Sequence, residues 1–118
     1  MKEISKSFSR RIGMWLALAE VSLVDYDLGL DKVTDRELPK DNWYFFSRLN
    51  VPRPIRRQGL ATELMLDLVD WADSCKCNIV NPINPYGDLD LTQLVKFYKK
   101  FGFEEISEGL MIRLYKEP

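Results

Sequence analysis

The residues with the clearest chemical potential form the segment Arg56-Arg57-Gln58-Gly59-Leu60-Ala61-Thr62. An apolar segment that ends at Val51 precedes it, and a helix-like pattern begins at Leu60. A strand, a glycine-containing turn and a helix N-terminus direct several backbone N–H groups at one place, where the helix dipole also favours an anion. The two arginines add positive charge beside this place. The segment therefore predicts a site for a phosphate-bearing ligand.

Histidine is absent from the chain, which restricts the acid–base chemistry open to it. Ser-His-Asp and Cys-His catalysis and any His-ligated metal site are excluded. A general acid or base must be a carboxylate, tyrosine, lysine, cysteine or a water molecule. Cys75 and Cys77 form a C-x-C pair, at which spacing a disulfide is strained, and one pair is no zinc site. We expect reduced cysteines and no metal cofactor.

Composition and charge indicate one domain, residues 1–118, without a broad attraction to nucleic acid or to a membrane. The 118 residues are 46% hydrophobic and carry a formal net charge of −1, so a core can form but no general basic field exists. Met1–Ser7 is polar and lacks the apolar stretch of a signal peptide. The longest apolar run, Met14–Ala19, is far too short to span a bilayer. We expect a cytoplasmic protein.

Alternating and periodic apolar residues predict a β-rich start followed by strand, helix, strand, helix and two strands. From Leu60 the apolar residues recur at helical spacing, with acidic residues on the other side. Asp90 is suited to cap a second helix, and Gly102 to occupy its C′ position. Gly29–Asp41 is typical of a connection. The predicted strands are Ser7–Asp27 in two pieces, Trp43–Val51 with both faces buried, Cys77–Asn81, Phe103–Glu108 and Leu110–Tyr115.

Two motifs, in this order, resemble the GCN5-related N-acetyltransferase (GNAT) superfamily. The first is its [Q/R]-x-x-G-x-[G/A] signature, matched by Arg56, Gly59 and Ala61 after the strand that ends at Val51. The second is its [L/F]-Y-x-[K/R]-x-G-F signature, matched by Phe97, Tyr98, Lys100, Gly102 and Phe103. A short glycine motif alone is weak, but the ordered pair is specific. The match covers Trp43–Tyr115, about two-thirds of the chain.

The resemblance implies an α/β (α+β) fold with a mixed, mostly antiparallel twisted sheet and two main helices. The family usually begins with a strand, two helices and two strands, for which the residues before Trp43 leave too little room. We expect those N-terminal helices to be missing or reduced, as in a minimal form similar to phage-encoded and anti-CRISPR acetyltransferases. Arg53 and Leu91 stand where the family often has proline and asparagine. Asn81 or Asn84 offers a weak substitute for that asparagine.

The resemblance also implies acetyl-CoA as cosubstrate and assigns site residues. Backbone N–H groups of the first motif hold the pyrophosphate, the strand end pairs with the pantetheine arm, and the backbone near Val51 polarises the thioester. Tyr98 is the expected general acid for the departing thiolate. From the residues alone, Gly59 also fits an ordinary turn, and Tyr98 a packed aromatic. The expected cofactor-binding residues are Leu49, Asn50, Val51, Arg56, Arg57, Gln58, Gly59, Leu60, Ala61 and Thr62.

The function that follows is acetyl transfer to a primary amine, with a protein lysine or N-terminus as the first choice of acceptor. A small amine is the alternative within the enzyme class, and a non-catalytic CoA-binding or inhibitory module is the rival outside it. Glu20, Asp25 and Asp88 are unranked candidates for the general base. A homodimer stays open, as does action in a host cytoplasm if the protein is phage-encoded.

Overall fold

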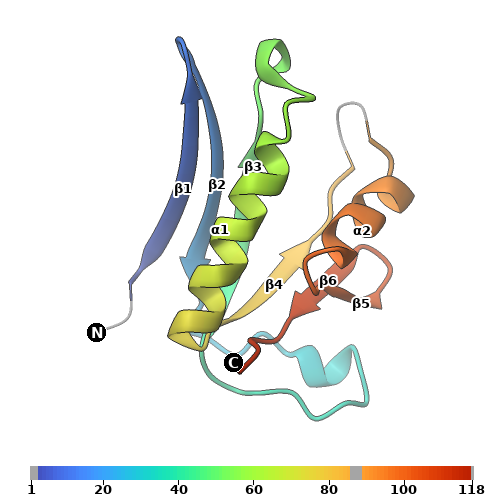
Figure 1. The fold of residues 1–118 in the computed structure, drawn as a ribbon. Coiled ribbons are helices and arrows are strands. Elements are labelled where there is room, and N and C mark those ends of the chain that lie inside the picture. The colour runs from blue at the N-terminus through green and yellow to red at the C-terminus, as the bar shows by residue number, and fades with distance from the viewer. Residues whose placement is uncertain (1–2, 86–88, 118) are drawn as a thin grey trace.

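Two α-helices lie on one face of a six-stranded sheet in the computed structural model, which describes residues 3–85 and 89–117 (Figure 1). α1 is Leu60–Cys75 and α2 is Leu91–Lys99. Short 3-10 turns occupy Leu30–Lys32 and Arg53–Ile55. The strands are β1 (Ser5–Ile12), β2 (Trp15–Leu23), β3 (Trp43–Asn50), β4 (Asn78–Pro82), β5 (Glu104–Ser107) and β6 (Leu110–Arg113). The predicted order of elements is confirmed.

The sheet has the order β1-β2-β3-β4-β6-β5 and is mixed but mostly antiparallel, as expected. β3 and β4 are parallel because α1 forms the crossover connection between them, whereas the other neighbouring pairs are antiparallel. β3 and β4 pair only from Trp43–Asn78 to Phe45–Val80. Beyond that point the two strands separate, and the sheet opens toward the C-terminal end of β3.

The main core lies between the sheet and the two helices. α1 buries an apolar stripe that includes Leu64, Met65 and Leu68, and it packs across β1 and β2. On β2 the residues that face it are Ala17, Ala19 and Val21, all with no exposed surface. Small side chains at alternate positions let the helix approach the strand closely. With both helices on this face, the start of α1 and one side of α2 lie at the opening between β3 and β4.

The second face of the sheet is covered at one end only. Residues 24–42 cross it and bury Leu30 against Trp43, Val80 and Ile112. Phe45, two residues along β3 from Trp43, is already 37% exposed. The expectation that β3 is buried on both faces thus holds at its start and fails beyond. In the described residues before β3 the helical structure is the Leu30–Lys32 turn, which confirms that the N-terminal helices of the family are reduced.

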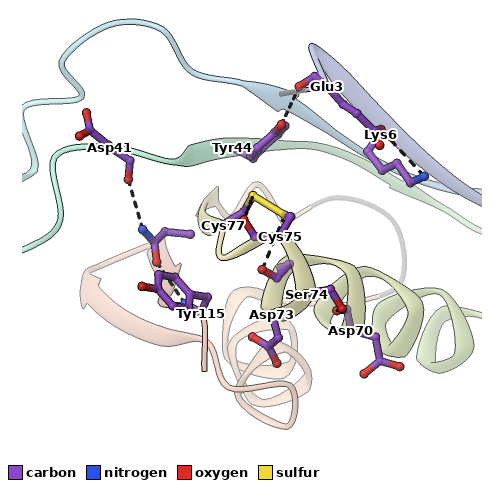
Figure 2. The surroundings of a disulfide bond; sticks show 12 residues. Glu3, Lys6, Asp41, Tyr44, Asp70, Asp73, Ser74, Cys75, Cys77 and Tyr115 are labelled. Atoms are coloured by element: carbon purple, nitrogen blue, oxygen red, sulfur yellow. Dashed lines mark hydrogen bonds and ion pairs between the residues drawn. A yellow bond between two sulfur atoms is a disulfide. The ribbon is translucent and has the colours of Figure 1, made fainter. Parts of the chain in front are cut away.

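The expectation of two reduced cysteines is wrong in this structure, where Cys75 and Cys77 form a disulfide at the end of α1 (Figure 2). Lys76, between them, caps the helix in the left-handed conformation, with φ 57° and ψ 50°. The two Cα atoms lie 5.5 Å apart, within the range that a disulfide spans. Residues two apart in the sequence can therefore be bridged, and spacing alone did not settle the state of the cysteines.

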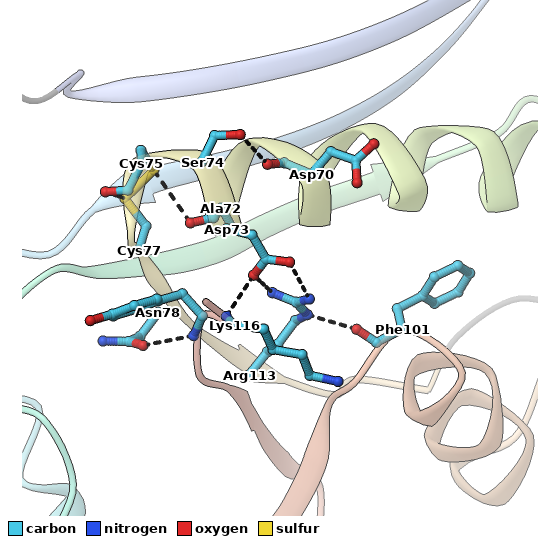
Figure 3. A network of polar contacts seen from close by, with 11 residues as sticks. Asp70, Ala72, Asp73, Ser74, Cys75, Cys77, Asn78, Phe101, Arg113 and Lys116 are labelled. Atoms are coloured by element: carbon cyan, nitrogen blue, oxygen red, sulfur yellow. Dashed lines mark hydrogen bonds and ion pairs between the residues drawn. A yellow bond between two sulfur atoms is a disulfide. The ribbon is translucent and has the colours of Figure 1, made fainter. Parts of the chain in front are cut away.

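An ion pair between a buried arginine and a partly exposed aspartate holds the C-terminal segment against α1 (Figure 3). Arg113, 4% exposed, donates to both carboxylate oxygens of Asp73 at 2.8 and 3.1 Å, and to the carbonyl of Phe101. The backbone N–H of Lys116 also donates to Asp73, at 2.9 Å. The Arg113 hydrogen bond lowers the pKa of the Asp73 carboxyl, although burial opposes this shift. The network links α1, β6 and the turn after α2.

In the part of the chain that the structure describes, no helix has the length and apolar character needed to cross a membrane.

Candidate active site

One cavity of about 590 Å³ occupies the opening between β3 and β4. Its walls are the end of β3, the loop that leads into α1, the end of β4, and α2. Every predicted cofactor residue except Gln58 lines it, and so does Tyr98. Its further lining residues are Phe45, Phe46, Ser47, Arg48, Asn81, Pro82, Ile83, Asn84, Leu89 and Leu94. The structure therefore brings together two motifs that lie far apart in the sequence.

The wall formed by β3 is an unpaired strand edge. After Phe45 the strand no longer bonds to β4, and its register with β2 shifts at Ser47, which lies between the partners of Val21 and Glu20. Such a bulge bends the strand locally. From Phe46 to Asn50 the side of β3 that β4 has left presents main-chain groups to the cavity. An extended ligand can pair there as an added strand does.

The loop before α1 is shaped for an anion. Ile55 is buried at 3% exposure and anchors the loop, while the Arg56 Nε donates to the Val51 carbonyl at 2.7 Å. Arg57 and Gly59 both have positive φ, 66° and 78°. Gly59 is the N-cap of α1, and no side chain of the described residues caps this end. The first N–H groups of a helix have no intrahelical acceptor, and Gly59 to Thr62 at this helix start line the cavity.

Arg56 has a more specific role than sequence reasoning gave it. Its guanidinium was expected to supply charge beside a phosphate. In the structure its Nε bonds back to the end of β3, which braces the turn between strand and helix.

Tyr98 reaches the cavity from α2. Asp90 caps this helix as predicted, with a reciprocal capping box in which Asp90 accepts from the Gln93 N–H at 2.8 Å. Tyr98 is 7% exposed, and its ring packs edge-on against Phe46 at 5.8 Å and Phe103 at 5.7 Å. Tyr98 is therefore both a packed core residue and part of the cavity wall.

The end of α2 differs by one position from the prediction. The C-cap is Lys100, so Gly102 lies two residues beyond it instead of at C′. Its φ of 91° still requires glycine, and a Cβ there would lie 3.2 Å from the Arg113 Nε. The chain turns tightly at this point so that β5 can begin beside the ion-paired arginine.

The charge of the described lining residues is positive. Arg48, Arg56 and Arg57 line the cavity, and no described lining residue is a carboxylate. Glu20 does not line it and instead accepts from the Ser7 hydroxyl at 3.1 Å. Asp25 lines a separate cavity of about 420 Å³ near Trp43. Asp88 lies outside the described residues.

Sequence reasoning did not identify Arg48 as a lining residue and gave Asn81 only a weak role. Arg48 is paired with Glu20 across a register shift, which a strand pattern does not reveal. Asn81 follows the last residue of β4 that pairs with β3. Its position after the short apolar run Ile79–Val80 was the available signal.

A cavity in a split mixed sheet thus brings together the helix start after the central strand and a tyrosine on the next helix. Residues 18–103 match the family model described as "Acetyltransferase (GNAT) family", which is more than half of the chain. The protein belongs to this family.

Solved structures share the fold at low sequence identity. The anti-CRISPR protein AcrVA5 superposes with a TM-score of 0.56 at 17% identity, over 90% of this chain and 96% of that one. Arabidopsis thaliana NAA60 in complex with a bisubstrate analogue gives 0.60 at 12% identity, over 88% and 66%. Escherichia coli YhbS, a GNAT family N-acetyltransferase in complex with CoA, gives 0.53 at 17%, over 85% and 57%. No curated protein sequence matches the chain.

Family membership makes the protein an acetyl-CoA-dependent acyltransferase. Within the described residues no cluster of three or more Cys, Asp or Glu side chains is suited to hold a metal ion.

Proposed function

We propose that the protein transfers the acetyl group of acetyl-CoA to a primary amine of a protein. The observation that carries this proposal is that the free edge of β3, the start of α1 and Tyr98 all line one and the same cavity. The pantetheine arm pairs with Leu49, Asn50 and Val51, and the pyrophosphate lies at the N–H groups that follow Gly59. The thioester then lies deep in the opening, near Tyr98.

Tyr98 protonates the departing CoA thiolate. A phenol has a pKa near 10 and a thiol one near 8.5, so the transfer requires a well-placed hydroxyl and a thiolate that is already forming. The edge-on ring contacts with Phe46 and Phe103 fix the tyrosine against the wall of the cavity. Fixed geometry of this kind is the condition under which a weak acid contributes to catalysis.

An α-amine is the acceptor that this lining fits best. The described lining residues offer no carboxylate as a base, so the amine must lose its proton to water or arrive neutral. At pH 7.5 roughly a quarter of an α-amine with a pKa near 8 is neutral, against about 0.1% of a lysine with a pKa near 10.4. The arginines at positions 48, 56 and 57 also disfavour a small polycation.

A second candidate role comes from the similarity to the anti-CRISPR protein AcrVA5. The two chains have nearly the same extent, with 96% of that chain covered, and this chain has reduced N-terminal helices. A protein of this form could block a defence protein of a host, either by acetylating it or by occupying its surface. Acetylation of such a host protein would be one example of the protein acceptor proposed above.

Binding and turnover test the proposal in two steps. Calorimetry with CoA should give a dissociation constant of about 1 μM, close to −8 kcal/mol. Acetyl-CoA turnover is then compared on three acceptors: peptides with a free N-terminus and no lysine, N-terminally blocked peptides with one lysine, and polyamines. We expect the free N-terminus to react fastest. CoA binding without turnover of any acceptor or of lysate proteins would instead support a non-catalytic module.

A further inference from the structure

Asn81 occupies the apex of the opening between β3 and β4. It follows Val80, the last residue of β4 that pairs with β3, and it lines the cavity together with Tyr98. By strand alternation it shares the helix-covered face of the sheet with Ile79 and Ile83, both in the main core. Only 3% of its surface is exposed. A carboxamide is therefore placed at the bottom of the site, on a strand and not on a loop.

The Nδ2 of Asn81 is buried and has no hydrogen-bond partner among the residues that the structure describes. A buried donor left in this state costs about 1–3 kcal/mol, and native proteins satisfy nearly all such groups. Asn78, on the same strand, is by contrast a buried asparagine whose side chain is hydrogen-bonded at both ends. It is 1% exposed, its Nδ2 donates to the Asp41 carbonyl at 3.3 Å, and its Oδ1 accepts from the Tyr115 N–H at 3.1 Å.

The partner that suits Asn81 is an oxygen at the deepest end of the bound ligand. The phosphate loop lies at the mouth of the opening, where β3 ends, and the apex lies where β3 and β4 meet. A pantetheine arm that runs along β3 carries its acyl end toward the apex. The ring of Phe46, one residue beyond the last β3 residue that pairs with β4, packs against that of Tyr98 at 5.8 Å, and Tyr98 and Asn81 line the same cavity.

We propose that Asn81 donates a hydrogen bond to the carbonyl oxygen of the bound thioester. This assignment rests on the function proposed above. Rotation of the amide about χ2 exchanges its two ends, so the N–H can be presented to the cavity. A preorganised donor at a carbonyl becomes more effective as negative charge develops on the oxygen. Asn81 is thus a catalytic residue that stabilises the tetrahedral intermediate, beside the backbone groups of β3.

The neutral amine nitrogen forms a bond to the carbonyl carbon, and the π pair moves to the oxygen, which accepts the Asn81 N–H. The carbonyl then re-forms, the C–S bond breaks, and the thiolate takes a proton from Tyr98. The amine nitrogen loses one proton to water, and Tyr98 regains its proton from water. Acetyl-CoA and amine thereby give amide and CoA.

The test compares Asn81→Leu with Asn78→Leu. Loss of one oxyanion donor typically lowers kcat about 10²–10³-fold, and we expect this for Asn81→Leu, with CoA affinity within roughly twofold of wild type because CoA lacks the thioester carbonyl. Asn78→Leu should lower the melting temperature and leave the kcat of the folded protein unchanged. Asn81→Ala removes the same donor without added bulk and should reproduce the fall in kcat.

A direct readout is the infrared stretch of 13C-labelled acetyl-CoA bound to each variant. A hydrogen bond to the carbonyl lowers its frequency, so the band should shift upward in Asn81→Leu and in Asn81→Ala relative to wild type. Unchanged kcat and an unchanged band in both variants would overturn the assignment. An equal loss of CoA and acetyl-CoA affinity would also overturn it, because Asn81 would then hold another part of the cofactor. Failure of wild type to bind CoA would instead refute the proposed function itself.

Discussion

Replacement of Tyr98 by phenylalanine separates the chemistry of this residue from its packing. The ring contacts Phe46, Phe97 and Phe103 with centroid separations of 5.8, 5.2 and 5.7 Å. Tyr98→Phe keeps these contacts and removes only the hydroxyl. Any large effect on rate therefore reports the O–H group and not the aromatic core around it.

The expected effect on rate is much larger than the expected effect on stability. A general acid is worth roughly 10²–10⁴-fold, which corresponds to about 3–5 kcal/mol of transition-state stabilisation. A single lost hydrogen bond changes the free energy of unfolding by about 1 kcal/mol. We therefore expect kcat to fall by about 10²–10⁴, while the affinity for CoA changes by well under tenfold.

Tyr44→Phe is the matched control. Tyr44 is 1% exposed, and its hydroxyl donates to the Glu3 carbonyl at 2.6 Å, away from the cavity lining. The Tyr44→Phe variant should lose about 1 kcal/mol of unfolding free energy and keep the wild-type rate of acetyl transfer. The assay is single-turnover acetyl transfer across pH 6–10 (a range of about four units, chosen to span the thiol and phenol pKa values). Wild-type turnover in Tyr98→Phe, with chemistry as the slow step, would refute the general-acid role.

Three further changes test the loop, the ion pair and the disulfide. Gly59→Glu should weaken CoA binding at least roughly tenfold, or 1.4 kcal/mol, by placing a carboxylate beside the pyrophosphate; Gly13→Glu, also at positive φ with open space around it, controls for backbone strain. Asp73→Asn should lower stability by about 1–3 kcal/mol at neutral pH, since Asp73 is partly exposed, whereas the exposed Asp70→Asn should not. Because the pKa of Asp73 is lowered in the fold, that difference is present above the ordinary carboxyl pKa and narrows as acid titration protonates wild type. Cys75→Ser should cost roughly 1–2 kcal/mol for so short a loop, and alkylation of unreduced, denatured wild type should label neither cysteine.

Local patterns predicted those parts of the site that depend on neighbouring residues. Gly59 stands at the N-cap of α1 because a turn with positive φ is needed there, and glycine adopts it without cost. Asp90 precedes an apolar helical period and forms the capping box that its spacing with Gln93 allows. Tyr98 follows from the position of its motif on that helix. Each of these features depends on residues only a few positions away in the sequence.

The features that sequence reasoning missed depend on where strands pair and where they stop. Asn81 and Asn78 are the same residue type on the same strand. Asn78 pairs within the β3–β4 ladder and its side chain is hydrogen-bonded, whereas Asn81 lies beyond the ladder and its Nδ2 has no partner among the described residues. The disulfide lies where the chain leaves α1 at the left-handed Lys76, whose side chain gives no sign of that conformation. Arg48 enters the cavity wall through a register shift in the neighbouring strand pair. Non-local pairing of this kind is not readable from periodicity.

The reduced N-terminal region bears directly on the size of the acceptor. Residues of both faces of β3 line the cavity, with Phe46 on the helix side and Phe45 on the other. Residues 24–42 cover the second face around Trp43 only, and Phe45 is 37% exposed beside them. If the cofactor fills the helix side, the amine must approach from this open second face. A polypeptide end can lie across such a shallow surface, whereas a small amine would find few walls to hold it. The same feature that shortens the fold thus favours a protein acceptor.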